Sequence, residues 1–162
     1  MPDGLYERDA LAWSDQQADL LRRIAAGEQL NEAVDWPNII EEVQDVGLSE
    51  LRTCESLIQQ AITHLPKLHV WPDSKAMKHW RDEIGVFLDD AGRRFTPSMR
   101  QRIKLGDLFA RAPRRARSAQ DETGSPRPLP DACPYTLDDL LDRDFDVGAL
   151  AARLGSSGPS PA

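Results

Sequence analysis

DWPNIIEEVQDVGLSE, residues 35–50, decides the fold class because it begins a long amphipathic helix. Asp35 can accept hydrogen bonds from the first free amides, and Pro37 in the first turn removes no intrahelical bond. From there, small or apolar residues recur every three or four positions, the spacing of one helix face: Ile40, Val43, Gly47, Leu51, Cys54, Ile58, Ala61 and Leu65. This spacing predicts a buried stripe on one helix over 36–65 that ends before Pro66. Because a helix can kink or break at a glycine, two shorter helices that share one axis and meet near Gly47 are the alternative.

The rest of the chain also shows helical periodicity. Three further principal helices and two short ones are expected, over about 5–26, 73–92, 96–112, 136–141 and 147–154. Pro113 removes an amide donor and crowds the carbonyl of Phe109, which leaves the path of the chain beyond it open. No segment has the alternation of a strand. The chain is therefore predicted to be all-α, a helical bundle of about four principal helices, mostly antiparallel, with a C-terminal segment of short helices packed on it.

Composition narrows the class of protein. The 162 residues are 40% hydrophobic and 29% charged, with no apolar run long enough for a membrane helix. One helical domain over 1–154 and a flexible tail over 155–162 are expected. The first residues lack a basic region followed by an apolar stretch, and there are two cysteines, so we expect a cytoplasmic protein with reduced thiols.

Several short motifs together carry a family resemblance. They are Leu5-Tyr6-Glu7-Arg8-Asp9, residues 35–50, Trp80, Thr123-Gly124 and residues 133–145, CPYTLDDLLDRDF. Because these motifs occur in this order and at this spacing, the chain resembles the bacterial helical family known as domain of unknown function 29. The resemblance covers about residues 5–145. The resemblance implies an all-helical fold in a bacterial protein with no assigned activity, and it transfers no catalytic residue. Pro113 departs from the uninterrupted helix that the resemblance leads us to expect.

One face of the helix over 36–65 is acidic. Asn38, Glu41, Glu42 and Asp45 lie opposite the apolar stripe at 100° per residue. They form either a binding site on a rigid helix or simply its solvated side, which is the more common case. Glu41 and Asp45 repel each other unless a cation lies nearby, and an arginine from residues 93–117 could supply it. Neither a metal nor another cofactor is expected, since the face has no histidine and the chain lacks paired Glu-x-x-His motifs.

A basic segment balances these acids. Residues 93–117 contain nine basic groups and one acid, whereas the net charge of the whole chain is −7. Arg111, Arg114, Arg115 and Arg117 are the candidate anion-binding residues, because clustered arginines can follow phosphates. No aromatic residues are interleaved with them, and the negative net charge makes nucleic acid an improbable partner. Pairing with the acids of 28–55 and 121–146 inside the fold is the preferred interpretation.

We interpret the remaining residues with reactive side chains as having structural roles. His79 and Glu83, one turn apart, could form half of a metal site, although a pair on the helix surface is the simpler interpretation. Cys54 belongs to the apolar stripe and is expected to be buried and inert. Cys133 precedes a proline in a loop, with no basic neighbour that would activate it. No catalytic residue is predicted.

Three functions remain open. The first is a non-enzymatic helical module that binds an unidentified protein, or itself, through a helix face. The second is a nucleic-acid-associated protein that uses the cluster Arg111–Arg117. The third is an enzyme with an unfamiliar carboxylate site, for which a pocket near Glu41, Glu42 and Asp45 is required.

Overall fold

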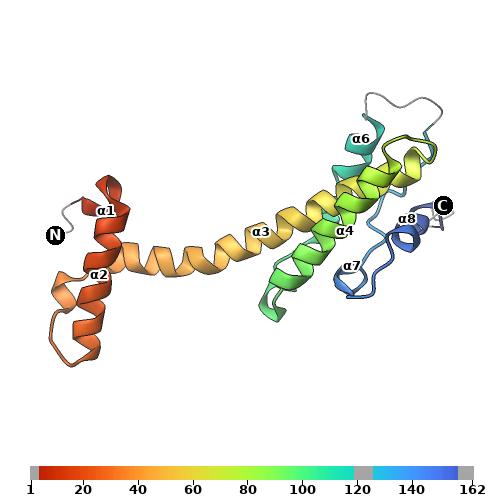
Figure 1. Ribbon diagram of the computed structural model, residues 1–162. Coiled ribbons are helices and arrows are strands. Elements are labelled where there is room, and N and C mark those ends of the chain that lie inside the picture. Colours follow the sequence, from red (N-terminus) through yellow and green to blue (C-terminus); the bar gives the residue numbers. More distant parts are fainter. Residues whose placement is uncertain (1–3, 119–125, 157–162) are drawn as a thin grey trace. The chain divides into compact units, whose positions relative to one another are not determined.

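The computed structural model describes residues 4–118 and 126–156, and in these ranges every regular element is a helix. The elements are α1 (Leu5–Arg8), α2 (Ala10–Ala25), η1 (Asn31–Ala33), α3 (Trp36–Val70), α4 (Met77–Arg94), η2 (Pro97–Met99), α5 (Leu105–Phe109), α6 (Ala112–Arg117), α7 (Leu137–Leu141) and α8 (Val147–Ser156), as Figure 1 shows. The predicted all-α class is confirmed. No helix among these residues is both long and apolar enough to cross a membrane.

The chain forms two compact units, residues 1–49 and 50–162, which we call the amino-terminal and carboxy-terminal units. The helix α3 contributes its first turns to the amino-terminal unit and its remaining turns to the carboxy-terminal unit. One domain over 1–154 stays a prediction. Of the expected tail, residues 155 and 156 belong to α8, and the rest lies outside the described residues.

The helix expected over 5–26 is broken at Asp9. Asp9 has an extended φ of −155°, and its side chain accepts a hydrogen bond from the Ala12 amide at 3.0 Å, which caps α2. An aspartate is a strong helix N-cap, so its local hydrogen bond outweighs the continuous periodicity around it. The helix α2 ends at Ala25, two residues before Gly27, whose φ of 99° suits a residue without Cβ.

The helix α3 is continuous through Gly47 and also through Pro66, so the expected end before Pro66 is wrong. Pro66 deprives one carbonyl of its partner within the helix. The apolar residues around it, including Leu65, Leu68 and Val70, are buried. Their burial offsets the lost bond, because one buried aliphatic side chain contributes roughly 1.5–3 kcal/mol.

The core lies in the carboxy-terminal unit. The helix α4 turns back beside the second half of α3 (Figure 1), and the two helices bury Cys54, Ile58, Ile84 and Leu88 between them and the shorter helices. The short helices α7 and α8 both pack on α4. Thr136 caps α7 in a reciprocal capping box with Asp139.

The helix expected over 96–112 is replaced by η2 and α5, and α6 begins at Ala112. Lys104 is extended between η2 and α5, and the buried residues Met99, Ile103 and Phe109 reach the core from three successive short segments. Pro113 lies in the first turn of α6, where its missing amide costs no hydrogen bond. The sequence left open the path of the chain beyond Pro113, and in the structure a new helix begins at this proline.

Candidate interaction surface

An open groove lies in the amino-terminal unit, between α2 and the first turns of α3. Its volume is about 240 Å³. It is lined by Trp13, Ser14, Gln17, Ala18, Leu21, Ile39, Glu42, Val43 and Val46. Most of these side chains are apolar, and Glu42 is the single charged one. We call this feature the amino-terminal groove.

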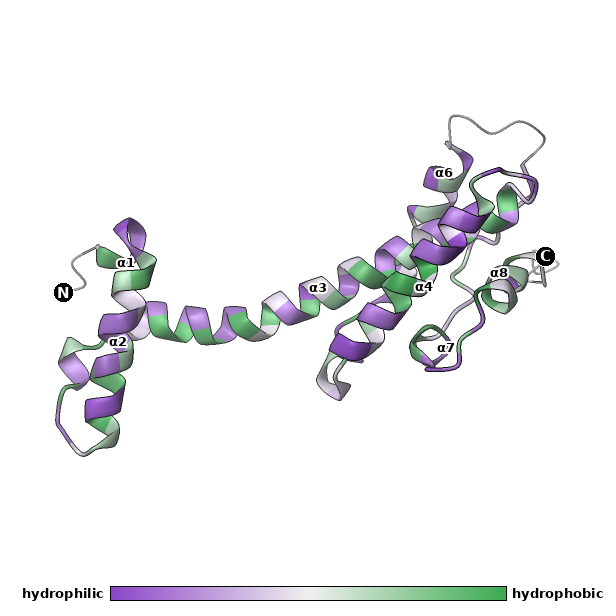
Figure 2. Ribbon diagram, in the orientation of Figure 1, coloured by the Kyte–Doolittle hydropathy of each residue, from purple (hydrophilic) through white to green (hydrophobic). Residues whose placement is uncertain are grey.

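Large apolar side chains at the groove are exposed to solvent. Val43 and Val46 in its lining are both 70% exposed, Ile40 on the same stretch of α3 is 55% exposed, and Leu11 on α2 is 73% exposed. The hydrophobic residues along the first turns of α3 are visible in Figure 2. The predicted buried stripe is therefore wrong at Ile40 and Val43, although it holds from Cys54 to Leu65. Within the carboxy-terminal unit, the stripe residues from Cys54 to Leu65 belong to the core, and Leu51 packs against it.

Asp35 fixes the wall of the groove. Its backbone amide donates to Gln17 Oε1 at 2.8 Å, and its Oδ2 accepts from Trp13 Nε1 at 3.1 Å. Asn38 Nδ2 donates to the same oxygen at 2.7 Å. The Asp35 carboxylate was expected to accept hydrogen bonds from the first backbone amides of the helix. In the structure, it accepts hydrogen bonds from the side chains of Trp13 and Asn38. These bonds hold the start of α3 against α2, and Asp35 Oδ1 is buried without a hydrogen-bond partner among the described residues.

The four residues of the predicted acidic face have different surroundings in the structure. Asn38 turns to Asp35, and Glu42 accepts a hydrogen bond from the Tyr6 hydroxyl at 2.6 Å. Glu41 and Asp45 are exposed. The hydrogen bond to Glu42, with burial and the charges of Glu42, Glu41 and Asp45, raises the pKa of Tyr6 to about 12. Tyr6 was missed as a contact of this face, because nothing in the sequence spacing relates it to Glu42.

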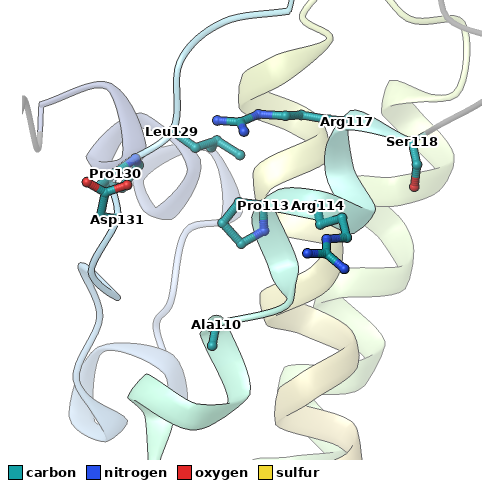
Figure 3. A pocket seen from close by; sticks show the side chains of 8 residues that line it. All are labelled: Ala110, Pro113, Arg114, Arg117, Ser118, Leu129, Pro130 and Asp131. Atoms are coloured by element: carbon teal, nitrogen blue, oxygen red, sulfur yellow. The ribbon is translucent and has the colours of Figure 1, made fainter.

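Two of the four predicted anion-binding residues line a different pocket, in the carboxy-terminal unit. Ala112 and Ala116 are buried and fix α6, whereas Arg111, Arg114, Arg115 and Arg117 are exposed. Arg114 and Arg117 line a pocket of about 510 Å³ together with Leu129, Pro130 and Asp131. In Figure 3, Arg117 extends toward Leu129. The structure thus brings two of the four arginines to this pocket.

The expected internal pairing of the basic segment holds only for part of it. Arg94 contacts Glu50 at 3.2 Å, and Arg100 contacts Asp138 at 2.8 Å. Within residues 4–118 and 126–156, no ion pair involves the four arginines from Arg111 to Arg117, nor Glu41 or Asp45. The charges at these positions are therefore not balanced by direct contacts among the described residues.

Comparison with protein families gives a clear assignment. The family described as domain of unknown function DUF29 matches residues 5–146. The chain belongs to this family. The resemblance seen in the sequence motifs is confirmed, although Thr123 and Gly124 of that set lie outside the described residues.

A solved structure resembles this DUF29 chain over most of its length. It is an alpha-helical protein of unknown function from Rhodospirillum rubrum, 33% identical, with a TM-score of 0.70. The match covers 92% of this chain and 96% of that one. No curated protein matches the chain. Neither the DUF29 family nor this neighbour has an assigned activity.

The other reactive side chains of this DUF29 chain are held by local contacts. Glu83 lies between two histidines, with Oε1 at 3.3 Å from His79 Nε2 and Oε2 at 3.0 Å from His64 Nε2. Among the described residues, no group of three or more potential ligands is arranged to hold a metal ion. Burial raises the pKa of both Cys54 and Cys133, which disfavours the reactive thiolate.

Proposed function

We propose that this DUF29 chain is a non-enzymatic helical module that binds a protein through the amino-terminal groove. The observation that carries the proposal is the exposure of two apolar side chains in the groove lining, Val43 and Val46, each of which is 70% exposed. Contiguous exposed apolar side chains typically mark a surface that another protein covers. The groove also offers little chemistry for catalysis, because its single carboxylate, Glu42, is bound to Tyr6.

The small core of the amino-terminal unit supports the same proposal. Among residues 4–49, the buried apolar side chains are Trp13 and Val34. A short helical unit with so few buried side chains gains little from the hydrophobic effect and usually depends on further contacts. A protein bound in the groove would supply them. The two free cysteines fit a reducing compartment, so we place this interaction in the cytoplasm.

Affinity capture with matched variants tests this function. Val43→Asp introduces a charge into the groove, whereas Val86→Asp changes a valine of the carboxy-terminal unit that is 57% exposed and outside the groove. We expect a tagged chain to retain a protein from an extract of the source cells, Val43→Asp to lose it, and Val86→Asp to keep it. Equal retention by both variants would rule out the groove as the binding surface.

Binding of nucleic acid is the second candidate function, since Arg114 and Arg117 line a pocket and no ion pair among the described residues neutralises them. It is tested by fluorescence anisotropy with a random DNA duplex at low salt. Binding that falls steeply with salt and is lost in Arg114→Ala/Arg117→Ala would support it. No binding at low ionic strength removes this candidate.

A further inference from the structure

We infer that the pocket lined by Arg114 and Arg117 binds a small organic phosphate, that is, a phosphate monoester with an apolar organic part. We call this pocket the arginine pocket. The inference goes beyond the proposed function, because the arginine pocket and the amino-terminal groove belong to different units and share no lining residue. Three features point to this ligand: walls that are held in place, arginines without an ion pair, and apolar space beside them.

Both walls of the arginine pocket are fastened to the end of α3. Trp71, the residue after α3, donates a hydrogen bond from Nε1 to Ala116 O at 2.9 Å and thereby holds α6. On the other side, the Arg127 amide donates to Val70 O at 3.4 Å and holds the segment that leads to Leu129. The end of α3 thus positions the two walls relative to each other. A ligand would therefore enter a site that is already formed, which lowers the cost of ordering on binding.

The two arginines carry charge that no contact balances. Arg114 and Arg117 are three residues apart on α6, so their side chains are neighbours and repel each other. Within residues 4–118 and 126–156, neither forms an ion pair, although Asp131 belongs to the same lining. Both side chains are exposed and can turn toward one ligand without breaking an ion pair among these residues. A bound anion would relieve their repulsion.

A phosphate monoester matches this charge better than a carboxylate does. It carries a charge of about −1.5 to −2 at pH 7 and has three acceptor oxygens. A guanidinium group offers paired N–H donors in a planar fork that fits two such oxygens. Two arginines therefore balance one dianionic phosphate, whereas a carboxylate would leave one of the two positive charges without a partner.

The arginine pocket has room for more than the phosphate group. Its volume of about 510 Å³ lies within the range of roughly 300–1,000 Å³ that is usual for small-molecule sites. In Figure 3, Pro113 and Leu129 lie between Arg114 on one side and Asp131 on the other. These apolar side chains would contact the organic part of the ligand. Such a pocket suits a small molecule better than a nucleic acid, whose backbone follows an extended basic surface.

Calorimetric titration of the purified full-length chain with phenyl phosphate at low ionic strength tests the site. We expect saturable binding with a Kd of about 1 mM or below. Arg114→Ala and Arg117→Ala should each weaken it about tenfold, because each removes charge-assisted hydrogen bonds. Arg115→Ala, at an exposed arginine of α6 outside the lining, is the control and should bind like the wild type. Absence of saturable binding, or an equal loss in all three variants, would overturn the inference.

Three further ligands test the chemical class. Benzenesulfonate has the same ring but a single charge, and inorganic phosphate lacks the organic part, so each should bind about tenfold more weakly than phenyl phosphate. Binding of phenyl phosphate should itself weaken below about pH 6, where its phosphate gains a proton. Equal affinities for the three small anions would contradict a site for an organic phosphate. Tighter binding of a random DNA duplex, lost in Arg114→Ala and Arg117→Ala, would assign the two arginines to nucleic acid instead.

Discussion

Trp13 Nε1 donates a hydrogen bond to Asp35 Oδ2 at 3.1 Å and thereby joins the middle of α2 to the start of α3. Both residues are buried, and Gln17 and Asn38 complete the contact. In a unit with a small apolar core, these polar bonds set the position of the two walls of the amino-terminal groove. The groove is therefore expected to be sensitive to Asp35.

Asp35→Ala should destabilise the amino-terminal unit by about 1–3 kcal/mol, because it leaves the buried indole N–H of Trp13 without an acceptor. Urea unfolding followed by tryptophan fluorescence measures the effect. Asp45→Ala, at an exposed acid of α3, is the control and should change stability by less than about 0.5 kcal/mol. Equal effects of the two substitutions would argue against the anchoring role of Asp35.

Ile58→Asp should cost about 4 kcal/mol or more and can unfold the carboxy-terminal unit, because Ile58 is fully buried and the new charge has no partner. Val86→Asp makes a similar change at a side chain that is 57% exposed and should have little effect. Thermal melts by circular dichroism compare the two. A stable Ile58→Asp chain would contradict the burial of the α3 stripe.

Asp139 should make the fold sensitive to acid. The Arg153 guanidinium at 2.7 Å and the Thr136 cap lower the pKa of Asp139 from its ordinary value of 3.8 to about 2. Because the folded pKa is the lower one, this carboxylate stabilises the fold above about pH 4, and the contribution is lost as the pH falls toward 2. Its size is about 1–2 kcal/mol, reduced by partial exposure of the side chain.

Urea unfolding at pH 5 and pH 2.5 measures this loss. Asp139→Asn should reduce the difference between the two pH values by about the same 1–2 kcal/mol. Asp138→Asn, at the neighbouring acid whose side chain is 78% exposed, is the control and should keep most of the difference. An unchanged difference in Asp139→Asn would show that the capping box does not carry the acid sensitivity.

Tyr6 should titrate late. The pKa of about 12 predicts that its hydroxyl stays protonated well above pH 10 in the folded chain. Glu42→Gln should move this pKa back toward 10, because the amide removes a negative charge and can donate to the phenolate. Glu41→Gln removes only a more distant charge and should have a smaller effect. The chain has two tyrosines, and NMR of the ring carbons separates Tyr6 from the buried Tyr135.

Much of the fold could be predicted from the sequence because helical periodicity reports which residues share a face. The stripe residues Cys54, Ile58 and Leu65 are buried as expected. Helix ends were less predictable. Asp9 interrupts a periodic segment by capping the next helix, and Pro66 fails to end α3 because the residues around it are packed into the core.

The candidate surface could not be predicted for a different reason. Periodicity shows that Ile40 and Val43 belong to an apolar face, but it does not show whether another segment of the chain covers that face. The hydrogen bonds from Tyr6 to Glu42 and from Trp13 to Asp35 join residues 36 and 22 positions apart, and no local pattern predicts them. The helical period places Ile40 and Val43 on the apolar face, but only the structure shows that both side chains are exposed.

Photo-crosslinking from the groove tests its role as an interface most directly. A benzophenone amino acid placed at position 43 of the full-length chain should give a covalent adduct on irradiation in an extract of the source cells, and the same probe at position 86 should not. An adduct of twice the chain mass identifies a second copy, and any other mass identifies a different partner. Absence of an adduct from position 43, or equal adducts from both positions, would contradict an interface at the amino-terminal groove.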